Sequence, residues 1–327
     1  MANLFVVASK EFSDIIKGKR FIILLAVFIL LMTAAVANTY ISATQGMATR
    51  PGLPMGFLRL VASGLTTMMS YFAPILGIAL GVDAISGERE KGTLKMVLAQ
   101  PIYRDTFIYG KFLGTLLAIS LAIFATSLIE VSGCIIALGI TPTSDDAIRL
   151  ILFILFSILY TMAYYGIAIL ISTLSKKTTV SVIAGVMIWA TFTFIIPIVA
   201  SLIAYSTVTI RIQPGQNITR IRPGENMTAE ARQIMEALRA RTSIMETINM
   251  FTPNYHFTRI AQYILQAFVT IGITEFRPGG GATLTTRPVT IMESLTSSWP
   301  NILVLALLTI ATFIISSAIF TKQEARE

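Results

Sequence analysis

Six long apolar runs, separated by polar connections, account for most of the chain. Each run is long enough to cross a bilayer, because about 20 helical residues span the hydrocarbon core. The sequence therefore predicts an all-α integral membrane protein with six transmembrane helices. The runs are Phe21–Ile41, Leu65–Ile85, Phe112–Ile140, Leu150–Leu174, Val180–Val208 and Ile302–Phe320.

The composition agrees with this prediction. Hydrophobic residues make up 54% of the 327 residues and charged residues only 13%, whereas soluble domains carry about 25% charged residues. The first run contains Ala35-Val36-Ala37, which resembles a signal-peptide cleavage site. The run is longer than the apolar part of a signal peptide, which has about 7 to 15 residues. We therefore interpret it as an uncleaved anchor.

The distribution of positive charge predicts the orientation. Lysines and arginines gather before the first run, between the second and third, between the fourth and fifth, and in the tail. The two short connections on the other side hold only Arg50, Arg59 and Arg149. Because short cytoplasmic loops are rich in positive charge, we expect a multi-pass protein of the cell membrane with both termini in the cytoplasm. The net charge of +8 then reflects this topology and not a nucleic-acid partner.

We expect three parts along the chain. Residues 1–208 hold an N-terminal amphipathic helix and the first five transmembrane helices, 209–299 form an extracellular segment, and 300–327 hold the sixth helix and a cytoplasmic tail. The sequence has no G-x-x-x-x-G-K-[ST] phosphate loop, so we expect no ATP or other cofactor on this chain and no enzyme activity of its own. The glycines at 279–281 lack a neighbouring lysine, and we interpret them as an external turn.

A dense polar segment follows the second run. Its charged residues stand in a row at Glu88, Arg89, Glu90 and Lys91. After a turn at Gly92-Thr93, apolar positions and a proline recur at helical spacing, at Leu94, Val97, Leu98 and Pro101. The pattern predicts an amphipathic helix over 86–101 that is too short to be stable alone. It could lie on lipid headgroups or dock into a protein groove, and its mixed charges favour the groove.

These residues resemble the signature of a known family. The run ISGEREKGTL at 85–94, followed by Gln100-Pro101, Arg104 and Gly110-Lys111, resembles the E-R-E-x-G-T-L…P…R…G-K pattern of ABC-2 type transporter permeases. Within that family the chain is most similar to the NosY-like branch, whose members accompany a separate ATPase subunit. The leader, with Lys10-Glu11-Phe12 before Lys19-Arg20-Phe21, is also similar to the family's entry into the first helix.

This resemblance implies a permease subunit of an ATP-binding cassette (ABC) transporter and favours export as the direction of transport. The helix over 86–101 would be a coupling helix seated in a cytoplasmic ATPase subunit, which would bind ATP and Mg²⁺. Two copies of the permease would work with two ATPases in the lipid bilayer, and the leader would lie along the inner membrane surface. The residues implied to meet the ATPase are Glu88, Arg89, Glu90, Gly92, Thr93, Leu94 and Leu98, with Lys176 and Lys177 in a second contact.

Glu130 is a carboxylate inside the third run. Such a residue indicates a substrate or ion path, although its late position also fits a hydrated residue of the outer leaflet. Small-residue pairs permit close helix contacts, and prolines inside the runs should kink their helices. These positions are Gly77 with Gly81, Gly110 with Gly114, Pro74 and Pro197.

The expected external segment contains a nine-residue tandem repeat, RIQPGQNIT followed by RIRPGENMT. Each copy carries an N-x-T acceptor, at Asn217 and Asn226, so glycosylation is a hypothesis for this side. Two amphipathic helices follow, over 229–250 and from 253 onward, the second with Ile260, Ile264, Leu265 and Phe268 on one face. His256 has no cysteine or second histidine near it, which favours a turn or interface residue over a metal ligand.

Three alternatives to an exporter subunit remain at this point. The large external segment also fits a subunit that transmits ATPase motion to an external partner without moving a substrate. An ion-coupled carrier would use Glu130 and would not need the polar segment after the second run. An intramembrane enzyme is the weakest alternative, since no catalytic pair converges in the runs. The sequence does not name a transported substrate.

Overall fold

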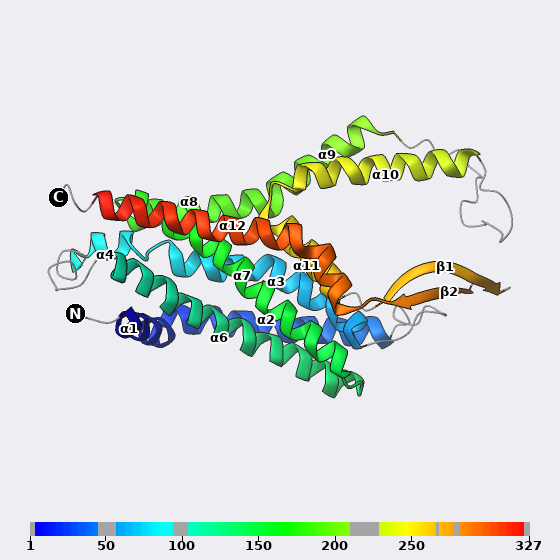
Figure 1. Cartoon of the computed structure of the whole chain (residues 1–327), viewed down its shortest axis with the longest axis horizontal. Coiled ribbons are helices and arrows are strands. Elements are labelled where there is room, and N and C mark those ends of the chain that lie inside the picture. The colour runs from blue at the N-terminus through cyan, green and yellow to red at the C-terminus, as the bar shows by residue number, and fades with distance from the viewer. Residues whose placement is uncertain are drawn as a thin grey trace.

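A computed structural model describes residues 4–44, 57–93, 104–209, 229–265, 268–277 and 281–323. Its long helices run side by side in one bundle, with the start of α1 and the end of α12 at the same end (Figure 1). We call this end the terminal end and the opposite one the far end. The elements of the bundle are α1 (Leu4–Lys17), α2 (Lys19–Thr44), α3 (Phe57–Gly81), α4 (Ser86–Glu90), α6 (Arg104–Leu138), α7 (Ser144–Leu174), α8 (Thr178–Ala190), η1 (Thr191–Ile195), α9 (Ile196–Thr207) and α12 (Ile291–Gln323). The others are α10 (Ala229–Asn249), α11 (Pro253–Leu265), β1 (Phe268–Arg277) and β2 (Gly281–Pro288).

Among the described residues, six segments are long and apolar enough to cross a membrane, as the sequence predicts. They are α2, α3, α6, α7, the continuous α8–η1–α9 segment and α12, so the prediction of an all-α membrane protein is confirmed. Four spans, α3, α6, α7 and α12, start six or more residues before their apolar runs. Helix α7 begins at Ser144, where Thr143 and Asp146 form a reciprocal capping box. Helix α12 begins at Ile291 and contains Pro300. Its first turns are polar, so the apolar run in the sequence does not include them.

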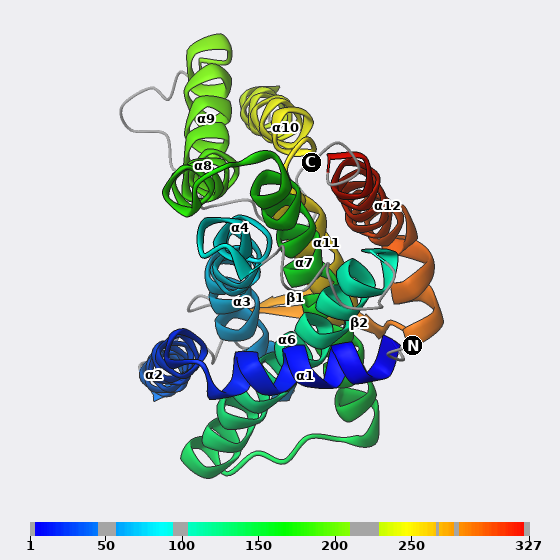
Figure 2. The same cartoon turned by 90° about the vertical axis from the view of Figure 1, so that its left-hand side faces the viewer.

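Helix α7 is the centre of the bundle. It packs against α3, α6, α11 and α12, and Figure 2 shows it surrounded by these elements. Its large side chains are fully buried, including Phe153, Tyr160, Tyr164 and Tyr165. Ile151 and Leu155 are 64% and 56% exposed on its outer side. Since the outer positions suit contact with lipid and the inner ones pack in the core, the run over 150–174 shows no polar face.

Glycines bring α3 and α7 into backbone contact. A Cβ atom added at Gly77 would lie 2.4 Å from the carbonyl oxygen of Thr161, and one at Gly81 would lie 2.6 Å from the Cβ of Ala168. The spacing of Gly77 and Gly81, a weak signal in the sequence, thus marks a real helix contact.

The leader helix α1 lies across the terminal end of the bundle. Figure 1 shows it end-on and Figure 2 shows it side-on, roughly perpendicular to the long helices. It packs on α6, where a Cβ at Gly110 would meet the Val7 side chain at 2.4 Å and one at Gly114 the Ala8 carbonyl at 2.7 Å. Its partly buried Phe12 packs on the core, so α1 is part of the folded bundle.

The fifth span bends at its centre. Residues Thr191–Ile195 form the π-helical turn η1, and Pro197 follows directly in the first turn of α9. Because proline has no N–H to donate, the α-helical hydrogen-bond ladder cannot continue through this point, and a π-turn accommodates the break. The kink predicted at Pro197 therefore takes the form of an elbow, from which α9 leaves the bundle (Figure 1).

Beyond the elbow, α9 and α10 lie side by side, and α11 returns into the bundle between α3, α7 and α12. Helices α10 and α11 confirm the two amphipathic helices predicted from the sequence. Helix α11 ends at Leu265, however, so Phe268 does not share its apolar face. Phe268 instead opens an antiparallel hairpin of β1 and β2. The sequence VTIGIT in β1 is rich in β-branched residues, which suit strands better than helices.

The glycosylation hypothesis is not addressed by the structure. Asn217 and Asn226, together with the rest of the nine-residue repeat, lie outside the described residues. The same holds for Gly279 and Gly280, although Gly281 begins β2 and pairs with Arg277 across the hairpin.

The contact of α3 with α7 yields a stability prediction. We expect Gly77→Ala to lower the free energy of unfolding by about 1–3 kcal/mol, the usual cost of forcing atoms into a packed core. The clashing atom is a backbone carbonyl of Thr161, so no side chain can move aside. Thermal unfolding in detergent measures the effect, with Ser63→Ala at an exposed position of the same helix as control. Equal melting temperatures for both variants would contradict the contact.

Candidate functional site

The polar segment that resembles the family signature forms the short helix α4 at the terminal end (Figure 1). The helix ends where Gly92 adopts a positive φ of 73° and its N–H donates to the Arg89 carbonyl at 3.1 Å. Glycine in this conformation is a common helix terminator. The helix predicted over 86–101 therefore breaks at Lys91-Gly92, where the sequence predicts a turn. Helical geometry resumes at Thr93, and Leu94 and Leu98 lie outside the described residues.

The N-terminus of α4 is capped by a residue of α7. Ile85, at the N-cap position, has an apolar side chain and cannot accept a hydrogen bond. The hydroxyl of Ser172 takes this role, accepting from the N–H groups of Ile85 at 3.0 Å and Ser86 at 2.9 Å. It also donates to the Ser86 hydroxyl at 3.1 Å. Both serines are fully buried, so these bonds are protected from water.

The C-terminus of α7 is capped in return by α4. The guanidinium of Arg89 donates to the carbonyl oxygens of Thr173 at 3.3 Å and Ser175 at 3.0 Å. The last carbonyl groups of a helix lack partners within the helix and carry a partial negative charge. The Arg89 guanidinium supplies both the missing hydrogen-bond donors and a positive charge opposite the partial negative charge of the helix end.

Helix α8 receives the third cap. Its first N–H, at Thr178, donates to the carboxylate of Glu90 at 3.0 Å. Lys177, at the N-cap position, is a cation and cannot accept that bond itself. A carboxylate is favoured here because helix N-termini carry a partial positive charge. We call this set of residues the capping joint; it comprises Ser86, Arg89, Glu90, Ser172 and Thr178.

Ion pairs connect the capping joint to the remaining elements at this end. Lys111 of α6 pairs with Glu11 of α1 at 3.0 Å, and its ammonium lies 4.0 Å from Glu88. Only 5% of the Lys111 side chain is exposed, which makes this pair less screened than a surface pair. Arg20 at the start of α2 contacts Asp83, in the turn between α3 and α4. Ser316 of α12 also reaches this place, with its hydroxyl 2.8 Å from that of Thr173, so all the candidate spans contribute to one polar cluster.

The structure gives the three expected contact residues partners within this chain, and their contact with an ATPase stays a prediction. Arg89 and Glu90 cap helices of this same chain, and Glu88 faces Lys111 and the Thr93 hydroxyl. Sequence reasoning took all three as a grip on another protein. The exposed side chains at this place include three lysines, Lys91, Lys176 and Lys177, together with the Glu90 carboxylate. We call these three lysines the basic patch; Gly92 lies exposed next to it.

Glu130 lies far from this cluster along α6. It is fully buried, and a Cβ added at Gly64 of α3 would lie 2.6 Å from its carboxylate and 3.4 Å from the Thr39 hydroxyl of α2. The Glu130 carboxylate therefore lies where α2, α3 and α6 of the same chain pack against one another. Among the described residues its oxygens have no hydrogen-bond partner, and no described group of His, Cys, Asp or Glu side chains could hold a metal.

At the far end, polar residues hold α11 in place, and sequence reasoning missed one of them. Arg149, with 1% exposure, donates to the Ile264 carbonyl at 2.9 Å, to Ser294 at 3.1 Å and to Asp145 at 2.6 Å. In the sequence, the only indication of this role was the spacing of four residues between Asp145 and Arg149, which permits an ion pair on one face of a helix. His256 lies 2.9 Å from Asn301 and 2.8 Å from the Met250 carbonyl, which confirms it as an interface residue.

Comparison with known proteins agrees with the fold and with the polar segment. The family model described as ABC-2 family transporter protein matches residues 5–325. The chain is a multi-pass membrane protein that belongs to this family.

Two curated relatives are similar over a shorter stretch. The probable ABC transporter permease protein NosY of Pseudomonas aeruginosa is 28% identical over 150 residues, which is 46% of this chain and 51% of that protein. The protein of the same name from Stutzerimonas stutzeri is 30% identical over 125 residues, 38% of this chain and 42% of that protein. The match thus spans about half the length of these relatives.

The capping joint predicts a local effect of Glu90. We expect Glu90→Ala to speed amide hydrogen exchange in the segment 172–180 about fivefold, since a capping bond is worth about 1 kcal/mol. Glu90→Gln is the matched control, because its amide oxygen can still accept from the Thr178 N–H. Mass spectrometry of peptides from this segment measures the effect. Identical exchange in the two variants would contradict a capping role.

Proposed function

We propose that this protein is the permease subunit of an ABC transporter and works as an exporter. A separate ATPase subunit binds ATP and Mg²⁺ and drives it. In this proposal the terminal end faces the cytoplasm and the basic patch meets the ATPase. Membership in the ABC-2 family and the similarity to permeases named NosY support it.

One observation carries the coupling mechanism, namely that α4 is joined to the ends of both α7 and α8 by the capping joint. A force applied to α4 therefore acts on the start of the fifth span and on the central helix together. The backbone contact of α3 with α7 adds a second rigid connection. A partner that pushes on the basic patch would thus move several spans as one body.

The expected stoichiometry is two permeases with two ATPases. The described part of each chain holds one set of six candidate spans, and ATP-driven closure of paired ATPases needs two points of attachment. Exposed apolar side chains along α2, α8 and α9 suit contact with lipid or with the second copy. The positive charge of the basic patch supports a cytoplasmic position for the terminal end.

A second candidate function is transmission of ATPase motion to an external partner without transport. The projection of α9, α10 and the hairpin beyond the bundle favours this candidate (Figure 1). An ion-coupled carrier has less support, since Glu130 is enclosed by α2, α3 and α6.

The test uses charge reversal on the basic patch. We expect Lys176→Glu with Lys177→Glu to lower recovery of a co-purifying ABC ATPase and its ATP hydrolysis at least tenfold, because opposite-charge contacts would become repulsive. The chain is purified with a tag from its native membrane, and the stoichiometry is measured by mass spectrometry. Both lysines are exposed, but the charge of Lys177 also acts on Glu90, so hydrogen exchange over 172–180 checks that the capping joint stays intact in the double variant.

Lys322→Glu is the control, since Lys322 is an exposed lysine at the same end but on α12, away from α4 and α8 in Figure 2. A stoichiometric ATPase that binds the double variant and the control equally would contradict the basic patch as its contact. If no ATPase co-purifies and Glu130→Gln abolishes ion flux in vesicles, the ion-coupled carrier would replace the proposal.

A further inference from the structure

Glu130 carries a carboxyl group that is enclosed where α2, α3 and α6 meet. It lies inside the third candidate span with an exposed fraction of 0%. A Cβ atom added at Gly64 of α3 would lie 2.6 Å from this carboxyl group and 3.6 Å from the Cβ of Ala35 of α2. About one turn along α6, a Cβ at Gly133 would lie 2.9 Å from the Val36 side chain of α2. Small residues therefore let three helices close around one carboxyl group.

The described side chains around Glu130 provide no positive charge. Apart from Glu130 itself, the charged residues of α2 and α6 lie within the first eight residues of each helix, at the terminal end. Arg149 of α7 lies at the far end, but its guanidinium is bound to Asp145 and to groups of α11 and α12. The charged residue of α3 is Arg59, whose side chain lies outside the described set. Cys134, four residues along α6, is a titratable neighbour but carries no positive charge.

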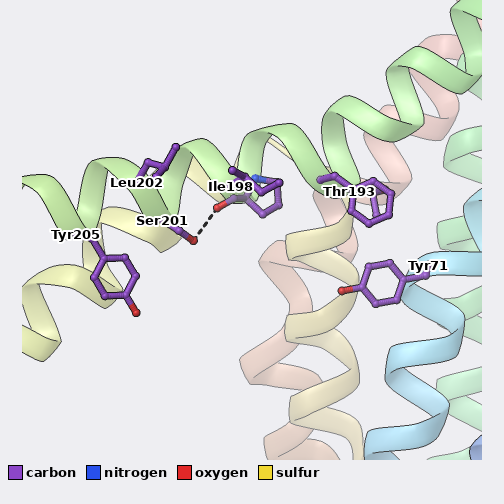
Figure 3. Close-up of a pocket in the computed structure, with 8 residues that line it drawn as sticks. Tyr71, Thr193, Ile198, Ser201, Leu202 and Tyr205 are labelled. Carbon is purple, nitrogen blue, oxygen red and sulfur yellow. Dashed lines mark hydrogen bonds between the residues drawn. The ribbon is translucent and has the colours of Figure 1, made fainter.

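Many hydroxyl side chains in the spans find a partner within their own helix. Ser201 of α9 donates to the Pro197 carbonyl at 2.8 Å (Figure 3), and Thr126 of α6 donates to the Ala122 carbonyl at 2.8 Å. An ionised carboxylate cannot do the same, because it has no proton to donate and only accepts. The two oxygens of Glu130 accordingly have no hydrogen-bond partner among the described residues.

A proton on Glu130 removes both the uncompensated charge and the lack of a donor. A buried carboxylate without a counter-ion loses its hydration, and such groups become neutral by binding a proton. The resulting O–H can donate to a hydroxyl group, and two hydroxyl groups lie nearby. Ser127, three residues earlier on α6, is buried and has no partner among the described residues. The hydroxyl of Thr39 of α2 lies 3.4 Å from the same Cβ position at Gly64.

We propose that Glu130 is a proton-binding site and that its bound proton keeps α2 and α3 closed on α6. Loss of the proton leaves a negative charge that water has to solvate. Water reaches this carboxylate only if α2 or α3 moves away from α6, since the three helices enclose it. Ionisation of Glu130 and opening of this contact therefore occur together. The proposal does not depend on the proposed function.

Infrared spectroscopy of the purified full-length chain in lipid nanodiscs tests the proton directly. At about pH 7 the wild type should show the C=O stretching band of a protonated carboxyl group, and the band should fall reversibly as the pH is raised. The band should be absent from Glu130→Gln, which keeps the shape of the neutral acid and cannot ionise. Isotope labelling of the glutamate carboxyl carbons distinguishes this band from that of an aspartic acid. A wild type without the band at about pH 7 would overturn the proposal and would indicate a counter-ion, for which Arg59 is the candidate.

Cys134 reports the opening of the contact, since it is fully buried and lies four residues from Glu130 on α6. Its rate of modification by a membrane-permeant methanethiosulfonate is compared between the wild type and Glu130→Gln. The ratio of the two rates cancels the titration of the thiol itself. We expect this ratio to rise with pH by up to about tenfold per pH unit, the value for release of one proton. A ratio that stays constant from about pH 6 to about pH 9 would overturn the proposal. Because no ATPase is present, these outcomes are separate from those of the coupling experiment.

Discussion

The reciprocal capping of helix ends in the capping joint is the interaction on which the rest of the structure depends. Ser172 of α7 caps α4, while Arg89 and Glu90 of α4 cap α7 and α8. Each bond alone contributes only about 1 kcal/mol. Together they fix the position and direction of three helices at one place. Apolar packing between spans cannot do this, since lipid tails are as apolar as the helix surfaces that they meet.

Helix α7 extends this constraint across the molecule. One end carries Ser172 and Thr173 in the capping joint, and the other carries Arg149, which holds the end of α11 and the start of α12. Between them, backbone contact with α3 at Gly77 leaves no room for sliding. The fifth span differs, because it leaves this rigid centre at the elbow that contains η1. Movement at the terminal end would therefore reach the far end through α7 and be absorbed at the elbow.

Hydrophobic periodicity was sufficient to predict the six spans, the leader helix and the two amphipathic helices α10 and α11. The capping joint could not be predicted, because its partners are 84 to 88 residues apart in the chain and Ser172 resembles any other serine of an apolar run. The turn at Gly92 that ends α4 was predicted, since glycine commonly terminates helices. The hairpin was missed, and its first residue, Phe268, was assigned to the preceding helix.

The central claim is that α4 and the start of α8 move as one body while the far end moves relative to them. Spin labels at Lys91→Cys and Lys176→Cys, with Cys134→Ala removing the native thiol, allow the distance between these exposed sites to be measured by pulsed electron resonance during ATP hydrolysis. A third label at Met292→Cys, exposed at the far end, reports motion across the bundle. The account predicts that the first distance stays constant while the distance to Met292→Cys changes. A first distance that shifts or broadens on ATP addition would contradict the capping joint as a rigid coupling element.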